Sequence, residues 1–298
     1  MFRKATTMGL LAAAVVASAV AAQAATITHG STTINMNFVT VGNAGNTADS
    51  TGYGAVGYNY SIGTYDVTAA QWAAVIAADP NVGTAGYWSG SQPVADVSWN
   101  EAAMFCNWLT TGNADSGYYS ISGGVATPNV LSHNAYAAVH GTTYFIPTEN
   151  EWYKAAYYNP GTSTYYTYPT GSNTVPTAVY GGTAAGTAVF YGNGVSPSAP
   201  ANVDNAGGLS PYGTMGQGGN LGQWNEADIF GDGSSRGLRG GSFGSNSDNL
   251  AASSRLIDIP PYEGSSLGFR VASVPEPGSI TLLVAGAIAG LIFWRRWR

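Results

Sequence analysis

Three short segments of this chain carry the hydrogen-bonding pattern that begins a helix. In each, a Ser or Thr hydroxyl can accept from the amide three residues later, while the Glu or Gln there returns to the amide of the cap. The pairs are Thr68 with Gln71, Ser98 with Glu101, and Thr148 with Glu151. Apolar residues at helical spacing follow each pair. We therefore expect three short helices, near residues 69–79, 99–110 and 149–158.

The remaining pattern indicates strands and loops. Residues 58–62 alternate like a half-buried strand, and 143–146 form a second short apolar run before Pro147. Between 159 and 205 the chain is rich in Tyr, Thr, Gly, Ser and Pro and nearly free of charge, which favours ordered irregular loops. The sequence thus predicts an α+β domain with little regular secondary structure.

The first 24 residues are typical of a secretory signal peptide. Arg3 and Lys4 precede an apolar run over residues 8–22, and Ala22 and Ala24 suit cleavage by signal peptidase after Ala24. We expect the following domain, residues 25–273, to be exported.

At the other end of the chain, residues 274–298 contain an apolar stretch, 280–294, that we predict to be a membrane helix. Its 15 residues are fewer than the roughly 20 that an untilted span needs. Arginines after the stretch would stay on the cytoplasmic side and leave the domain outside. The flanking features are Pro275, Glu276 and Pro277 before the stretch, and Arg295, Arg296 and Arg298 after it.

These three parts in this order resemble the PEP-CTERM sorting signal of Gram-negative bacteria that make exopolysaccharide. The resemblance implies that an exosortase-type transpeptidase recognises the tail. A plain membrane anchor is the alternative. Under both interpretations the protein is held in the cell envelope at the inner membrane, transiently or stably, and the first then places it on the cell surface or in the extracellular matrix.

The charge of the domain argues against nucleic-acid binding, and the cysteine content excludes an intrachain disulfide. Residues 25–273 carry five basic and fifteen acidic side chains, a difference of −10, whereas nucleic-acid binding needs the opposite sign. The single cysteine, Cys106, excludes an intrachain disulfide. It lies on the apolar face of the second expected helix, so we predict that it packs in the core.

Six motifs follow one another in an order that resembles the formylglycine-generating enzyme family, also called the sulfatase-modifying factor domain, over about residues 34–273. They are Ile62-Gly-Thr-Tyr-Asp-Val-Thr68, Pro93-Val-Ala-Asp-Val-Ser-Trp99, Phe145-Ile-Pro-Thr-Glu-Asn-Glu-Trp152, Gly219-Asn-Leu-Gly-Gln-Trp224, Arg239-Gly-Gly-Ser-Phe243 and Leu267-Gly-Phe-Arg-Val271. The resemblance implies a C-type-lectin-like α+β fold. It also implies that Arg239, Arg255 and Arg270 are semi-buried and paired with carboxylates or carbonyls.

Enzymes of that family carry two cysteines shortly after the Arg-Gly-Gly-Ser-aromatic motif, and these hold Cu(I), a soft ion that prefers thiolates. Here residues 243–251 contain no sulfur, and Ser245 stands about where the first cysteine would be. We therefore predict no catalytic residue of this type and no redox cofactor. The alternative is a formylglycine-generating sulfatase activator or a diverged metal-dependent oxygenase.

The same resemblance raises the question of two other metals, iron and calcium. A second branch of the family uses a His-rich iron site, but only His29, His133 and His140 are present, and we interpret the last two as solvated loop histidines. Family members often bind calcium through the segment matching 219–224. Asn220 persists there, and Glu226 is a substitute donor, so calcium stays open as a ligand.

Aromatic residues suggest what the domain could bind. A cluster of tyrosines with Asn and Thr could stack on sugars, as an alternative to packing beneath their own loops. These are Tyr157, Tyr158, Tyr165, Tyr166 and Tyr168. Our leading hypothesis is a non-catalytic binding or structural module, with exopolysaccharide as a candidate partner. Glu149 and Glu151 are assigned to helix capping and the helix dipole rather than to acid–base chemistry.

Overall fold

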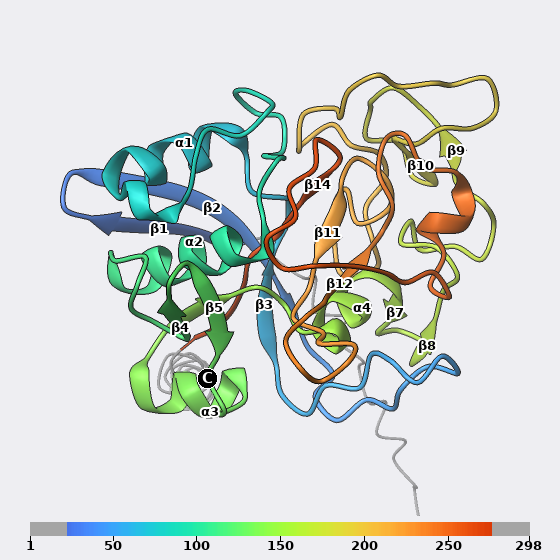
Figure 1. Cartoon of the computed structure of the whole chain (residues 1–298). Coiled ribbons are helices and arrows are strands. Elements are labelled where there is room, and N and C mark those ends of the chain that lie inside the picture. Colours follow the sequence, from blue (N-terminus) through green and yellow to red (C-terminus); the bar gives the residue numbers. More distant parts are fainter. Residues whose placement is uncertain (1–22, 276–298) are drawn as a thin grey trace, which may run out of the picture.

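The computed structural model describes residues 23–275, and most of that chain is irregular (Figure 1). Its helices are α1 (Ala69–Ala78), α2 (Trp99–Thr111), α3 (His133–His140) and α4 (Glu149–Tyr157), with 3-10 turns η1 (Pro80–Val82) and η2 (Ser247–Leu250). All three predicted capping boxes are closed, and the helices that they begin are confirmed. The number of helices is wrong by one, because α3 follows Ser132, whose side chain makes no capping bond.

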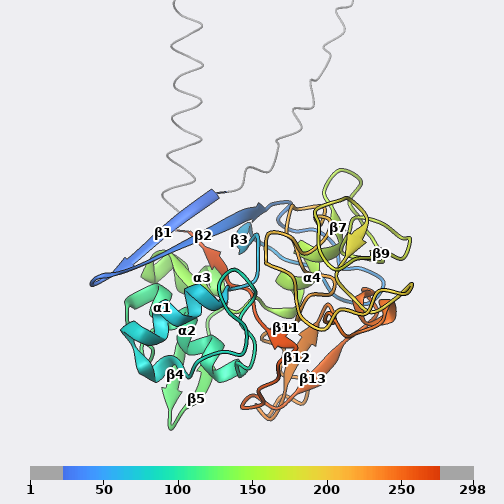
Figure 2. The same ribbon diagram turned by 90° about the horizontal axis from the view of Figure 1, so that it is seen from above.

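A five-stranded antiparallel sheet joins the two ends of the described chain. Its order is β1 (Gln23–His29), β2 (Thr32–Val41), β3 (Tyr60–Gly63), β15 (Ala272–Val274) and β6 (Thr143–Phe145). The predicted strands at 58–62 and 143–146 correspond to β3 and β6. Helices α1, α2 and α3 lie along one side of this sheet (Figure 2).

A second sheet stands beside the first. Its order is β13 (Leu256–Asp258), β12 (Arg236–Arg239), β11 (Gly222–Trp224) and β14 (Leu267–Gly268), and only the β11–β14 pair is parallel. Three small pairs complete the structure: β4 (Tyr119–Ser122) with β5 (Val125–Pro128), β7 (Tyr158–Asn159) with β8 (Thr164–Tyr165), and β9 (Thr177–Ala178) with β10 (Thr187–Ala188). The predicted irregular region from 159 to 205 therefore holds only two-residue strands.

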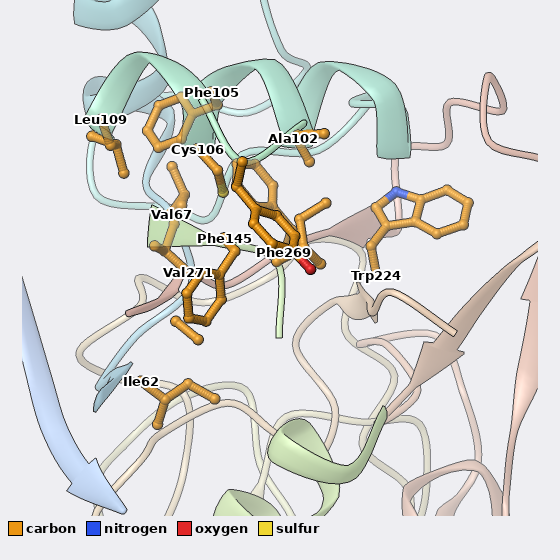
Figure 3. Packing of buried hydrophobic residues seen from close by; sticks show 14 of the residues in the cluster. Ile62, Val67, Ala102, Phe105, Cys106, Leu109, Phe145, Trp224, Phe269 and Val271 are labelled. Carbon is orange, nitrogen blue, oxygen red and sulfur yellow. The ribbon is translucent and has the colours of Figure 1, made fainter. Parts of the chain in front are cut away.

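The main apolar core lies between the five-stranded sheet and α2. Cys106 points from α2 into the cluster that also contains Phe145, Phe269 and Val271 (Figure 3). The thiol is fully buried, as predicted, and burial raises its pKa well above the usual value. Cys106 is therefore a packing residue.

A buried arginine links the two sheets. Arg270 lies 3.2 Å from the carboxylate of Asp66 and donates to the carbonyl of Thr64 at 3.0 Å. Its Nε donates to Gln223 on β11 at 3.1 Å. The predicted pairing of the three arginines is confirmed, because Arg239 and Arg255 both bind Glu149.

Several predictions concern residues outside the described range. These are most of the signal peptide (residues 1–22), and Glu276, Pro277, the apolar stretch 280–294 and the terminal arginines. β1 begins at Gln23, two residues before the predicted start of the mature domain. Among residues 23–275, no helix has the length and apolar character needed to cross a bilayer.

Candidate functional site

A small pocket opens where β12 and its following turn meet the segments around η2 and β14. It encloses about 120 Å³. Its lining comes from parts of the chain that are distant in sequence: Gly222, Leu238, Arg239, Gly240, Gly241, Ser242, Ser245, Asn249, Ser254, Leu256, Ser266 and Leu267. We call it the serine pocket.

Apart from Arg239, the polar side chains of the serine pocket carry hydroxyls and one amide. Ser242, Ser245, Ser254 and Ser266 contribute hydroxyls, and Asn249 contributes the amide. The Ser245 hydroxyl accepts from the Ser242 amide at 2.9 Å, and the two hydroxyls lie 3.3 Å apart. Hydroxyls both donate and accept, so the pocket can match a neutral polar ligand.

Arg239 lines the pocket, but its charge is already compensated. Its Nε donates to the Glu149 carboxylate, and its Nη1 donates to the carbonyls of Ala252 at 3.0 Å and Ser254 at 2.7 Å. Arg255 donates to the second Glu149 oxygen at 2.8 Å. Glu149 lies in the first turn of α4, whose capping box is formed by Thr148 and Glu151, and it binds two arginines, one of which lines the pocket.

The two glycines after Arg239 shape the wall of the pocket. Gly240 and Gly241 have φ values of 90° and 65°, in the left-handed region. A Cβ on Gly240 would lie 2.6 Å from the carbonyl oxygen of Gln217. Close backbone approach therefore requires glycine at this position.

Three aromatic side chains, Tyr87, Trp88 and Phe243, pack against one another beside segments that line the pocket, and we call them the aromatic ridge. Trp88 lies edge-to-face with Tyr87 at 4.7 Å and with Phe243 at 6.0 Å between ring centroids. Its indole N–H donates to the carbonyl of Ser265 at 3.0 Å. Phe243 directly follows the pocket residue Ser242, and Ser265 directly precedes the pocket residue Ser266, so the ridge contacts two segments that line the serine pocket.

The predicted tyrosine surface needs correction. Tyr157, Tyr158 and Tyr168 are buried, and the Tyr157 hydroxyl donates to the carbonyl of Leu250 at 3.0 Å. Tyr165 and Tyr166 are half-buried. The first three pack beneath their loops, the alternative considered above, because apolar clusters around α4 and η2 enclose them.

The two predicted calcium donors lie in different surroundings. The Asn220 side chain exchanges hydrogen bonds with the backbone of Ala201, at 2.8 and 3.3 Å. Glu226 instead accepts from Tyr119 and contacts His133. Calcium binding stays a prediction to which this geometry adds no support.

The interpretation of His133 as a solvated loop residue is wrong. His133 begins α3 and is fully buried, with Nε2 3.0 Å from Glu226. Its other nitrogen contacts Glu151, which also accepts from Tyr58 at 2.8 Å. Burial would lower the pKa of His133, but Glu151 and then Glu226 outweigh it and raise the pKa to about 10. His140 is exposed, although it ends the same helix.

The donor set of the serine pocket does not fit the copper site that the sequence resemblance implies. Cu(I) prefers sulfur, whereas this pocket offers hydroxyl and amide groups. Cys106, the only cysteine of the chain, lies buried on α2. Among the described residues, no group of three or more His, Cys, Asp or Glu side chains is arranged to hold a metal.

Comparison with known protein families gives a match for the domain and a second match for the C-terminal tail. Residues 20–274 match the model of the sulfatase-modifying factor enzyme 1-like domain, and residues 273–296 match the PEP-CTERM protein-sorting motif. None of the curated proteins compared with the chain matches it.

Solved structures share the fold. Variable protein 1 of Treponema denticola is 25% identical with a TM-score of 0.55, and the match covers 85% of this chain and 99% of that one. CarF is 21% identical with a TM-score of 0.59, covering 80% and 97%. PvdO from Pseudomonas aeruginosa is 16% identical with a TM-score of 0.54, covering 80% and 94%.

Proposed function

Because the chain belongs to the sulfatase-modifying factor enzyme 1-like domain family and carries a PEP-CTERM sorting motif, we propose that it is an exported, non-catalytic module that binds a neutral ligand in its serine pocket. The motif indicates export and association with the cell envelope. An exosortase-type enzyme is then the partner that processes the tail. Signal peptidase would remove the leader, and the mature domain would reside on the cell surface or in the matrix.

The observation that carries this proposal is the chemistry of the serine pocket. Ser245, about where the resemblance puts the first copper-binding cysteine, lines the pocket together with Ser242. A hydroxyl with a pKa far above neutrality does not supply the thiolate that a soft metal needs. The same hydroxyls suit hydrogen bonding to a neutral ligand.

Exopolysaccharide is the ligand class that best fits the location and the chemistry. Sugars present many hydroxyls that pair with serine and asparagine, and pockets for neutral ligands combine a few such groups with apolar walls. Leu238, Leu256 and Leu267 supply those walls here.

Two measurements on the purified protein test the proposal. With copper and a Cys-x-Pro-x-Arg peptide, mass spectrometry should find no formylglycine, and turnover would overturn the non-catalytic assignment. Calorimetric titration with oligosaccharides from the host's exopolysaccharide should give binding that Ser266→Phe, which fills the pocket, abolishes. Ser266→Ala is the matched control, because it removes the hydroxyl without filling the space.

A further inference from the structure

We propose that the aromatic ridge is a second subsite, which extends the serine pocket into an elongated binding surface for a neutral polysaccharide chain. This inference rests on the proposed function and adds both the extent of the site and the class of ligand. Tyr87 and Trp88 come from the loop between η1 and α2, whereas Phe243 follows the pocket residue Ser242.

The size of the serine pocket argues for a ligand that continues beyond it. The pocket encloses about 120 Å³, whereas sites that bury a whole small ligand enclose about 300 Å³ or more. Only one small unit of a ligand fits. Further contacts must come from the neighbouring surface, and a polymer supplies repeated units for them.

The ridge is accessible and already ordered. Tyr87 is 63% exposed, and Trp88 and Phe243 are partly exposed. Trp88 is fixed by its bond to Ser265 and by edge-to-face contacts with both other rings. Aromatic side chains have few rotatable bonds, so a ligand that contacts them loses little conformational entropy from the protein.

The combination of groups matches a sugar chain. The C–H faces of sugar rings are apolar and stack on aromatic rings, while the ring edges carry hydroxyls. The rings of the ridge would stack on the face of one sugar unit. The hydroxyls of Ser242, Ser254 and Ser266 would form hydrogen bonds with the edge of the next unit.

Charge selects a neutral polymer over an acidic one. Arg239, the one charged side chain lining the pocket, is paired with Glu149. Residues 25–273 carry a difference of −10 between basic and acidic side chains, and this field repels polyanions.

The inference is tested with the full chain in detergent by affinity electrophoresis and tryptophan fluorescence. The neutral probes are hydroxyethylcellulose, galactomannan and dextran, each with its constituent monosaccharide, and carboxymethylcellulose is the acidic probe. The variants are Tyr87→Ala and Trp88→Phe in the ridge, Ser266→Phe in the pocket, and Tyr180→Ala as the control. Tyr180 is 64% exposed, like Tyr87, but does not line the pocket or the ridge.

We expect Tyr87→Ala to weaken binding of a neutral polysaccharide about five-fold, since one stacking contact is lost, and to leave binding of the single sugar unit, which occupies the pocket alone, unaffected. Trp88→Phe should retain most of the affinity, Tyr180→Ala all of it, and Ser266→Phe should abolish binding of both ligands.

The outcomes separate this inference from the proposed function. If Tyr87→Ala leaves polysaccharide binding unchanged while Ser266→Phe abolishes it, the ridge is no subsite and the pocket still binds. If Ser266→Phe has no effect, the pocket assignment fails. Tighter binding of carboxymethylcellulose than of hydroxyethylcellulose, or no binding of any probe, overturns the neutral-polysaccharide class.

Discussion

Nδ1 of His133 lies 3.0 Å from Oε2 of Glu151, at a point that solvent does not reach. The ring stacks on Phe145 at 3.5 Å between centroids, and Glu226 faces its other nitrogen. A protonated imidazole between two carboxylates therefore joins α3 to α4 and to the segment after β11. The side chains of His133 and Glu151 are almost completely buried, and that of Glu226 is 9% exposed.

Replacing His133 should destabilise the fold. In His133→Gln, Glu151 and Glu226 lose the cation between them, and removing one partner of a buried ion pair costs about 3 kcal/mol. Urea denaturation measures the change in the free energy of unfolding. His140→Gln, on the exposed end of the same helix, should change it by less than about 0.5 kcal/mol. Equal effects of the two substitutions would contradict the structural role of His133.

The same group predicts a pH dependence. The pKa of His133 rises from 6.5 in the unfolded chain to about 10 in the folded one. Its contribution to stability is therefore complete below about pH 6.5 and is lost as the pH rises through about 10. Between about pH 7 and about pH 9.5, the wild-type protein should lose more unfolding free energy than His133→Gln. Parallel curves for the two proteins would refute the shift.

The loss of unfolding free energy at low pH has a different origin from the loss at high pH. Burial would raise the pKa of Glu151, but His133 and further hydrogen bonds lower it overall. A carboxylate with a lowered folded pKa loses its contribution only as the pH falls through that value. The difference between wild type and His133→Gln at alkaline pH therefore reports on His133, and the loss of stability at acid pH includes Glu151.

Local signals in the sequence predicted the helices that carry capping boxes and missed the one that lacks them. Ser132 makes no side-chain cap bond, and α3 is stabilised by burial of His133 and Tyr136 instead. Those contacts are with residues distant in the sequence, so neither α3 nor the buried ion cluster has a local signature. The arginine pairs were predictable because the motifs around them resembled a known family.

The pocket could be predicted only in part. Ser245 was identified by its position after the glycine pair. The aromatic ridge was missed because it joins residues 87 and 88 to residue 243, far along the chain. Its one signal is two adjacent aromatics among small residues over 83–90, without helix or strand periodicity.

Glu149 should be essential to the support beneath the pocket. Glu149→Gln leaves buried Arg239 without its carboxylate, and we expect a loss of about 3 kcal/mol in unfolding free energy. Arg255→Lys should cost less than about 1 kcal/mol, because Arg255 is partly exposed and solvent screens its charge. Thermal and urea unfolding of both variants check the ranking, and the reverse order would show that Arg239 does not depend on Glu149.

Alanine substitutions at two glycines distinguish the steric cost of a new Cβ from the conformational cost of a positive φ. Gly240→Ala should destabilise by about 3 kcal/mol, since the new Cβ combines an unfavourable φ with contact against Gln217. Gly186 has a similar φ of 74° but open space around it, so Gly186→Ala should cost only about 1 kcal/mol. Circular dichroism during urea titration measures both. Similar losses would indicate that the wall of the pocket can move.

The thiol of Cys106 should not react with thiol reagents in the folded protein. Burial raises the pKa of its thiol, and α2 shields it from reagents. Ellman's reagent should detect no thiol under native conditions and one thiol per chain in urea. Cys106→Ala should lower the unfolding free energy by about 1 kcal/mol, as expected when a small buried group is removed. Rapid labelling of the native protein would place the thiol at the surface.

The last strand of the domain, β15, lies inside the five-stranded sheet, between β3 and the edge strand β6. A chain that leaves the cytoplasm amino end first delivers β1, β2 and β3 long before their missing neighbour. The sheet therefore stays open until residues 272–274, directly before the sorting motif, have also crossed. Completion of the native sheet therefore waits for the last segment of the domain, so a transport intermediate that lacks it would be an incomplete, protease-sensitive form.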